Sequence, residues 1–177
     1  IVNQVSSLKH MVDDFREYAR KPPVVLAPVD FNELVDEVLG LYGWDPLSGQ
    51  VQEDANQPWQ LEVLLDPELP VILGDPTQLR QVVHNLLANA RDALAEVSHP
   101  AVIRVTTQLI PPGAAETADR AAVRFTVSDN GAGFSAQVLQ RAFEPYVTTK
   151  TQGTGLGLAI VRRSEERRVG KECLRLC

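Results

Sequence analysis

Residues 84–93 read HNLLANARDA and belong to a long helix that opens at Asp75 and Pro76. Aspartate is a favoured N-cap and proline fits the first helical position, so this pair marks a helix start. Asn85 and Asn89 are four residues apart, which places both amides on one face of the helix. Apolar side chains recur at helical spacing along the same segment: Leu79, Val82, Val83, Leu86, Leu87, Ala90 and Leu94.

The segments around this helix predict an α+β domain. Apolar or alternating runs are typical of strands, whereas an aspartate or serine before an amphipathic run is typical of a helix start. We expect mostly antiparallel strands with the helices on one face, a two-layer α/β sandwich. Strands are predicted at 59–66, 71–74, 101–110 and 121–129, shorter helices at 30–42, 135–143 and from 155, and loops at 43–58 and 111–120.

The first twenty residues carry apolar side chains in steps of four and three, which is a heptad pattern: Ile1, Val5, Leu8, Val12, Phe15 and Ala19. This pattern predicts one helix over residues 1–21, which either packs on its own domain or pairs with a partner. Prolines at 22 and 23 end it, because proline lacks an amide donor. Residues 22–29 are then interpreted as a linker. Because the chain begins on Ile1, we expect it to be a fragment of a longer protein.

Composition excludes several classes of protein. The chain has 177 residues, of which 44% are hydrophobic and 23% charged, as expected for one globular domain. A net charge of −6 argues against general binding to nucleic acid. No run of 18 apolar residues and no signal peptide is visible, so we expect no membrane contact by this fragment. The only cysteines, Cys173 and Cys177, lie in the last five residues, which fits a reducing cytoplasmic setting.

Three short patterns are candidates for chemistry. DNGAGF at 129–134 ends a strand and is either a tight turn or a place where a ligand meets a carboxylate beside bare backbone. GTGLGL at 153–158 opens a helix, where free amides and the helix dipole favour anionic oxygens. Asn85 and Asn89 either hydrogen-bond locally or offer oxygens to a hard cation such as Mg²⁺.

Taken together and in this order, these patterns resemble the ATP-binding catalytic domain of bacterial sensor histidine kinases, within the gyrase, Hsp90 and MutL superfamily. The asparagine box corresponds to 85–90, the first glycine box to 129–133 and the second to 153–158. FEPYVTTK at 143–150 resembles the phenylalanine box and the mobile lid. The resemblance implies a Bergerat ATP-binding fold over residues 30–163, with ATP and Mg²⁺ as cofactors.

The resemblance also implies roles for individual residues. Asp129 accepts a hydrogen bond from the adenine amino group, and Gly131 and Gly133 let the base come close. Asn89 holds Mg²⁺, and Asn85 lies beside it near the phosphates. The remaining implied nucleotide contacts are Phe143, Gly153, Thr154, Gly155, Leu156 and Gly157.

Lys150 is expected either to bring a positive charge near the γ-phosphate or to be a solvated lysine of the lid. Two other positions depart from related proteins. Asp92 stands where many members carry a lysine three residues after the magnesium ligand. Asn85 replaces the glutamate with which the ATP-hydrolysing relatives activate water, and a neutral amide cannot act as a general base. The substitution favours phosphoryl transfer to another residue over hydrolysis.

The N-terminal helix resembles the second helix of a dimerisation hairpin, most closely in NtrY-type nitrogen-regulation sensors. The implied parent is a homodimeric, inner-membrane histidine kinase that passes its phosphoryl group to a response regulator. The acceptor histidine is expected upstream, because the residues around His10 do not match the acceptor motif. Two alternatives are a gyrase- or MutL-like ATPase and a non-catalytic dimerisation scaffold.

The last residues do not continue the family pattern. RSEERRVGKEC at 163–173 resembles a translated DNA-sequencing adapter, so we interpret residues 164–177 as an artefactual tail. The alternative is a genuine charged C-terminal segment. If the tail is foreign, the last two strands of the sheet are missing and leave an exposed edge.

Overall fold

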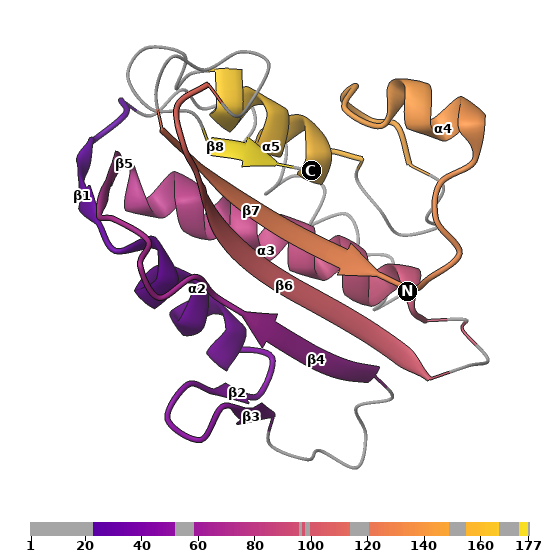
Figure 1. The fold of residues 1–177 in the computed structure, drawn as a ribbon. Coiled ribbons are helices and arrows are strands. Elements are labelled where there is room, and N and C mark those ends of the chain that lie inside the picture. The colour runs from indigo at the N-terminus through magenta and orange to yellow at the C-terminus, as the bar shows by residue number, and fades with distance from the viewer. Residues whose placement is uncertain are drawn as a thin grey trace, which may run out of the picture.

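In the computed structural model, helices cover one face of a four-stranded sheet (Figure 1). The predicted N-terminal helix over 1–21 lies outside the residues that the structure describes. These are residues 23–51, 59–95, 97, 100–113, 121–148, 155–166 and 174–176.

The main sheet has the order β4-β6-β7-β8, with β4 at Trp59–Leu64, β6 at Ala101–Ile110, β7 at Ala122–Asp129 and β8 at Leu174–Leu176. β6 and β7 are antiparallel, whereas β4–β6 and β7–β8 are parallel. Antiparallel pairs outnumber parallel pairs among the strands that the structure describes, as expected, but parallel pairs are the majority within this sheet. The physical reason is that a helix crosses over between β4 and β6, and such a crossover brings the chain back in the same direction.

The short strand β8 differs from the expectation that the sheet ends at β7. Its three residues pair in register with Val123, Arg124 and Phe125 of β7. The foreign origin of residues 164–177 stays a prediction, since a strand can form from any extended segment that reaches a free edge.

Four helices are described: α2 at Phe31–Gly40, α3 at Pro76–Ala93, α4 at Ala136–Arg141 and α5 at Gly157–Glu166. The predicted N-cap of α2 is confirmed, because a side-chain oxygen of Asp30 accepts from the amide of Glu33. The long central helix is also confirmed, with Pro76 in its first turn. α3 contacts α2, α5 and β7, so it packs against both neighbouring helices and the sheet.

Two small ribbons contain strands at 27–29, 44–45 and 50–51, which the sequence predicts as linker or loop, and one at 72–74, which confirms the strand predicted at 71–74. β1 (Ala27–Val29) pairs antiparallel with β5 (Ile72–Gly74), and β2 (Trp44–Asp45) pairs antiparallel with β3 (Gln50–Val51). Strands of two or three residues are too short to show an alternating pattern. The pairing of β1 also depends on residues far along the chain, which no local pattern contains.

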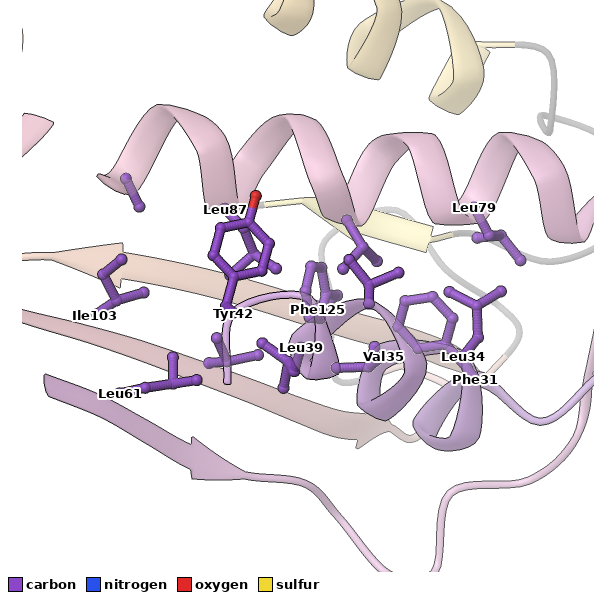
Figure 2. Close-up of a cluster of buried hydrophobic side chains, with 14 of the residues drawn as sticks. Phe31, Leu34, Val35, Leu39, Tyr42, Leu61, Leu79, Leu87, Ile103 and Phe125 are labelled. Atoms are coloured by element: carbon purple, nitrogen blue, oxygen red, sulfur yellow. The ribbon is translucent and has the colours of Figure 1, made fainter. Parts of the chain in front are cut away.

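The core lies between α2, α3 and the sheet, and Figure 2 shows its side chains pointing toward one another. Phe31 of α2 meets Phe125 of β7 edge to face, with ring centroids 5.5 Å apart. The stripe predicted for α3 is buried at Leu79, Val82, Val83, Leu87 and Ala90. Burial of this stripe against α2 and the strands turns the opposite side of α3 toward α5. Among the described helices, none is long and apolar enough to cross a membrane.

Candidate functional site

The two asparagines of α3 face the first turn of α5. The side-chain amide of Asn85 donates a long hydrogen bond of 3.5 Å to the carbonyl oxygen of Gly157. A Cβ on Gly157 would lie 3.7 Å from Nδ2 of Asn89 and 3.9 Å from Cγ of Asn85. The predicted pair of amides therefore shares one helix face, and that face meets the second glycine segment.

Local geometry requires glycine just before α5. Gly155 has φ +66°, and a Cβ there would lie 2.6 Å from the carbonyl carbon of Tyr146. The amide of Tyr146 donates to the carbonyl oxygen of Gly155 at 2.9 Å. This bond joins the segment that ends at residue 146 to the segment that begins at residue 155. Leu156 is fully buried and anchors the start of the helix. Lys150, Gly153 and Thr154 lie outside the described part of the chain.

The DNGAGF segment is a turn at the end of β7, and its carboxylate stays exposed. An oxygen of Asp129 accepts from the amide of Gly131 at 2.9 Å, which confirms the turn interpretation. A carboxylate has about four acceptor positions, so this bond leaves Asp129 able to accept from a ligand as well. Turn and ligand site are therefore compatible at this residue.

The two glycines of this turn have different reasons to be glycine. A Cβ on Gly131 would lie 2.5 Å from the carbonyl oxygen of Ala93, so the turn packs directly on the C-terminal end of α3. Gly133 instead has φ +68°, with nothing within 4 Å of an added Cβ. Backbone conformation rather than close contact requires glycine at 133.

All three predicted segments thus converge on one helix. Gly157 lies against Asn85 and Asn89, and Gly131 lies against Ala93. With a rise of 1.5 Å per residue, Asn89 and Ala93 are about 6 Å apart along the axis of α3. An exposed carboxylate and a pair of amides therefore border the same side of the fold within the span of one small ligand.

Exposed apolar side chains lie along the segment that follows the DNGAGF turn. Phe143, predicted as a nucleotide contact, is 45% exposed. Phe134, Leu139 and Tyr146 are exposed as well. These residues belong to α4 and its flanking turns, which stand apart from the sheet in Figure 1. The side chain of Phe143 is thus partly open to solvent, and its nucleotide contact stays a prediction.

Sequence reasoning missed Asn130. Its side-chain oxygen accepts from the amide of Val102 at 2.8 Å, and its side-chain nitrogen donates to the carbonyl of Pro100 at 2.9 Å. Asn130 thereby holds the end of β7 to the start of β6 and sets the direction in which Asp129 leaves the sheet. The sequence did contain a signal for this role, because Asn130 directly follows the aspartate of the predicted turn.

Other polar residues near the asparagine box have local partners. Asp92 forms an exposed ion pair with Arg91 at 3.2 Å. Nδ1 of His84 lies 3.4 Å from the hydroxyl of Tyr42, on the side of α3 that packs against α2. Burial raises the pKa of the Tyr42 hydroxyl. His84 is thus a positioning contact and is not part of the asparagine face.

Comparison with known proteins now decides the family. Residues 74–175 match the family of histidine kinase-, DNA gyrase B- and HSP90-like ATPases. The chain belongs to this family. The matched range contains α3, the DNGAGF turn and the start of α5, so the match to this ATPase family covers the whole site described above.

Individual relatives of this ATPase domain are sensor kinases. The chain is 34% identical over 170 residues to the sensor histidine kinase ZraS of Escherichia coli strain K12, covering 96% of this chain and 32% of ZraS. It is 31% identical over 177 residues to the nitrogen regulation protein NtrY of Azorhizobium caulinodans, covering 96% of this chain and 20% of NtrY. The chain thus spans a third or less of the length of these relatives.

A solved structure supports the fold. ShkA in complex with AMPPNP has a TM-score of 0.65 and 29% sequence identity, and the match covers 93% of this chain and 31% of ShkA. The expected α+β fold, with helices packed on a sheet, is confirmed by this similarity.

Proposed function

We propose that this chain is the ATP-binding catalytic part of a sensor histidine kinase. In the proposed reaction the bond between the γ-phosphorus and the oxygen that it shares with the β-phosphate breaks, and that oxygen stays on ADP. The γ-phosphorus forms a new bond to a histidine nitrogen. The acceptor histidine is proposed to precede residue 1. The observation that carries the proposal is the convergence of the two asparagines, the first turn of α5 and the DNGAGF turn on the helix α3.

The chemistry of the site suits a nucleotide. Asp129 has acceptor capacity beyond its bond to Gly131, as recognition of an exocyclic amino group requires. Gly131 and Gly133 keep the turn free of side chains beside it. The amides at the start of α5 and the positive end of its helix dipole suit phosphate oxygens. The proposed phosphate contacts are Gly153, Thr154, Gly155, Leu156 and Gly157.

The asparagine face suits a magnesium ion shared with phosphates. Mg²⁺ in such sites takes one or two protein oxygens and keeps several waters. Asn89 is proposed as the protein ligand, since its amide oxygen adds no negative charge that would repel phosphate. Asn89 would hold the ion beside the phosphates, where its positive charge would offset the negative charge of the transferred group.

Asn85 is proposed to orient the phosphates and not to activate water. Its amide has no basic group at neutral pH, so the site lacks at this position the general base that hydrolysis requires. Positioning and charge neutralisation then supply the catalysis. Lys150 is proposed to bring a further positive charge to the γ-phosphate, and Phe143 to support the lid beside the nucleotide.

The remaining assignments are proposals about the longer protein. Residues 1–21 would be the second helix of a dimerisation hairpin, residues 22–29 a linker, residues 30–163 the catalytic domain and residues 164–177 a foreign tail. The partners would be a second copy of the kinase and a response regulator in a nitrogen-regulation pathway. The catalytic part would lie on the cytoplasmic side of an inner-membrane parent.

A calorimetric titration with AMPPNP, with and without Mg²⁺, tests the proposal. Asp129→Ala should lower the affinity about tenfold or more under both conditions, because a hydrogen bond to a charged group contributes about 1.5–3 kcal/mol. Asn89→Ala should keep the metal-free affinity and lose the gain that Mg²⁺ brings.

Glu62→Ala provides the control, because Glu62 is an exposed residue of β4 that pairs with Arg104. This variant should bind as the parent chain does. Unchanged affinity in Asp129→Ala, or absence of binding heat in the parent chain, would contradict the proposal and favour a scaffold without nucleotide.

A further inference from the structure

Asp75 is a buried carboxylate that holds more than the end of its own helix. The residue as a whole is only 6% exposed. One oxygen caps α3, accepting from the amides of Thr77 at 3.0 Å and Gln78 at 3.2 Å. The second oxygen accepts from the amide of Val25 at 3.0 Å, fifty residues earlier in the chain. The second oxygen also accepts from the side-chain amide of Gln78 at 3.4 Å, so it joins the first turn of α3 to the segment that contains Val25.

The strand register explains why a side chain makes this bond. The ladder between β1 and β5 runs up to the pair Ala27 and Gly74. Continued by two residues, it would place Val25 opposite Pro76, where β5 has already turned into α3. The helix start therefore cannot extend the ladder. The carboxylate of Asp75 accepts from the N–H of Val25 instead, two residues before the start of β1.

The segment before β1 has little burial to hold it. Val24, Val25 and Leu26 are 41%, 65% and 54% exposed. Its bond to Asp75 is therefore a large part of what fixes it to the domain. Asp75 is in turn fixed to α3 by its bonds to the amides of Thr77 and Gln78. Figure 1 shows β1 and β5 together at the end of α3 where the helix begins.

We propose that Asp75 is a positioning residue that ties the segment 23–26 to the start of the helix bearing Asn85 and Asn89. The direction in which the chain enters the domain is thereby set relative to the asparagine face. Asp75 itself lies ten residues before Asn85, about 15 Å along the helix axis, so it does not touch the site. Its consequence for phosphoryl transfer rests on the proposed function, whereas its hold on the entering segment does not.

Asp75→Asn separates the two roles of the side chain. Asparagine is as good an N-cap as aspartate, so its oxygen can keep the amides of Thr77 and Gln78. Its amino group is a donor and cannot accept from Val25. Asp30→Asn is the matched control, since Asp30 also caps a helix, accepting from the amide of Glu33 at the start of α2. Val25→Pro removes the same bond from the other side and leaves the cap of α3 intact.

NMR relaxation of the 177-residue chain is the measurement. Val24 and Leu26 keep their backbone amides in both Asp75→Asn and Val25→Pro. Their order parameters should fall from about 0.85 to below about 0.6 in each variant. The AMPPNP affinity should stay within about twofold of the parent chain, since the site is about 15 Å away. Asp30→Asn should change neither quantity.

The functional consequence is measured in a longer protein that carries the acceptor histidine. Both variants should lower the turnover of phosphoryl transfer on the order of tenfold and leave the KM for ATP unchanged, because misplacement costs turnover more than binding. Unchanged order parameters would overturn the inference. A loss of AMPPNP affinity in both variants would also overturn it, by making Asp75 a structural residue of the site. If the parent chain bound no nucleotide, only the proposed function would fail, and the order parameters would still decide the hold on segment 23–26.

Discussion

At the scale of single residues, close contact decides which side chains the site tolerates. Gly131 has no room for a methyl group, because a Cβ would come within 2.5 Å of the carbonyl oxygen of Ala93. The opposing atom belongs to the backbone of α3 and cannot rotate away. This close approach holds the turn that bears Asp129 against the C-terminal end of α3.

We therefore expect Gly131→Ala to lower the free energy of unfolding by about 1–3 kcal/mol, the usual cost of overpacking. Thermal unfolding should show a lower Tm by roughly 2–4 °C for each kcal/mol. Gly40→Ala is the control, because nothing lies within 4 Å of a Cβ added there. That variant should be as stable as the parent or up to about 1 kcal/mol more stable. Equal stability of the two variants would show that the turn moves freely away from α3.

At the scale of elements, the β2–β3 hairpin is organised by one carboxylate. The hydroxyl of Ser48 donates to Asp45 at 2.8 Å and the amide of Leu47 at 3.0 Å. These bonds hold the pKa of the Asp45 carboxyl below its ordinary value of 3.8. The indole of Trp44 donates to Asp36 and connects the hairpin to α2.

The depressed pKa gives the hairpin a defined pH dependence. Its stabilisation by Asp45 is fully present above the unfolded pKa and is lost as the pH falls through the folded pKa. NMR titration of the amide of Leu47 should follow this loss in acid. Ser48→Ala removes the largest cause of the shift, so the transition should move to higher pH. A transition that stays at the same pH in this variant would contradict the assignment.

At the scale of the whole molecule, the proposed nucleotide contacts α3, the end of β7 and the start of α5 at once. A ligand that binds only this folded arrangement stabilises it by mass action. At a concentration of AMPPNP about 100 times its Kd, with Mg²⁺, the free energy of unfolding should rise by about 2.7 kcal/mol. Thermal unfolding should report a higher Tm for the parent chain.

Asp129→Ala should show a clearly smaller rise at the same AMPPNP concentration, about 1.4 kcal/mol or less if its affinity falls tenfold or more, while Glu62→Ala should match the parent. A comparable increase in the Asp129→Ala chain would place the nucleotide elsewhere on the protein. The comparison separates stabilisation by a specific site from a general effect of the added anion.

The sequence by itself determined the elements that depend on local patterns. The cap and apolar stripe of α3, the alternation of β6 and β7 and the positive φ angles of Gly133 and Gly155 each act over a few residues. Their order along the chain was enough to indicate an ATPase of the histidine kinase type. It also placed Asn85 and Asn89 on one helix face, because that follows from helix geometry alone.

Only the tertiary structure decided what depends on contacts between distant segments. The parallel register of β4 and β6, the pairing of β1 with β5, the bond from Asp75 to Val25 and the clamp by Asn130 join residues that no local window contains. The same holds for the approach of Gly131 to Ala93 and of Gly157 to the two asparagines. Such contacts form only when the buried stripe of α3 packs against α2 and the sheet, which leaves its polar face toward the turn and α5.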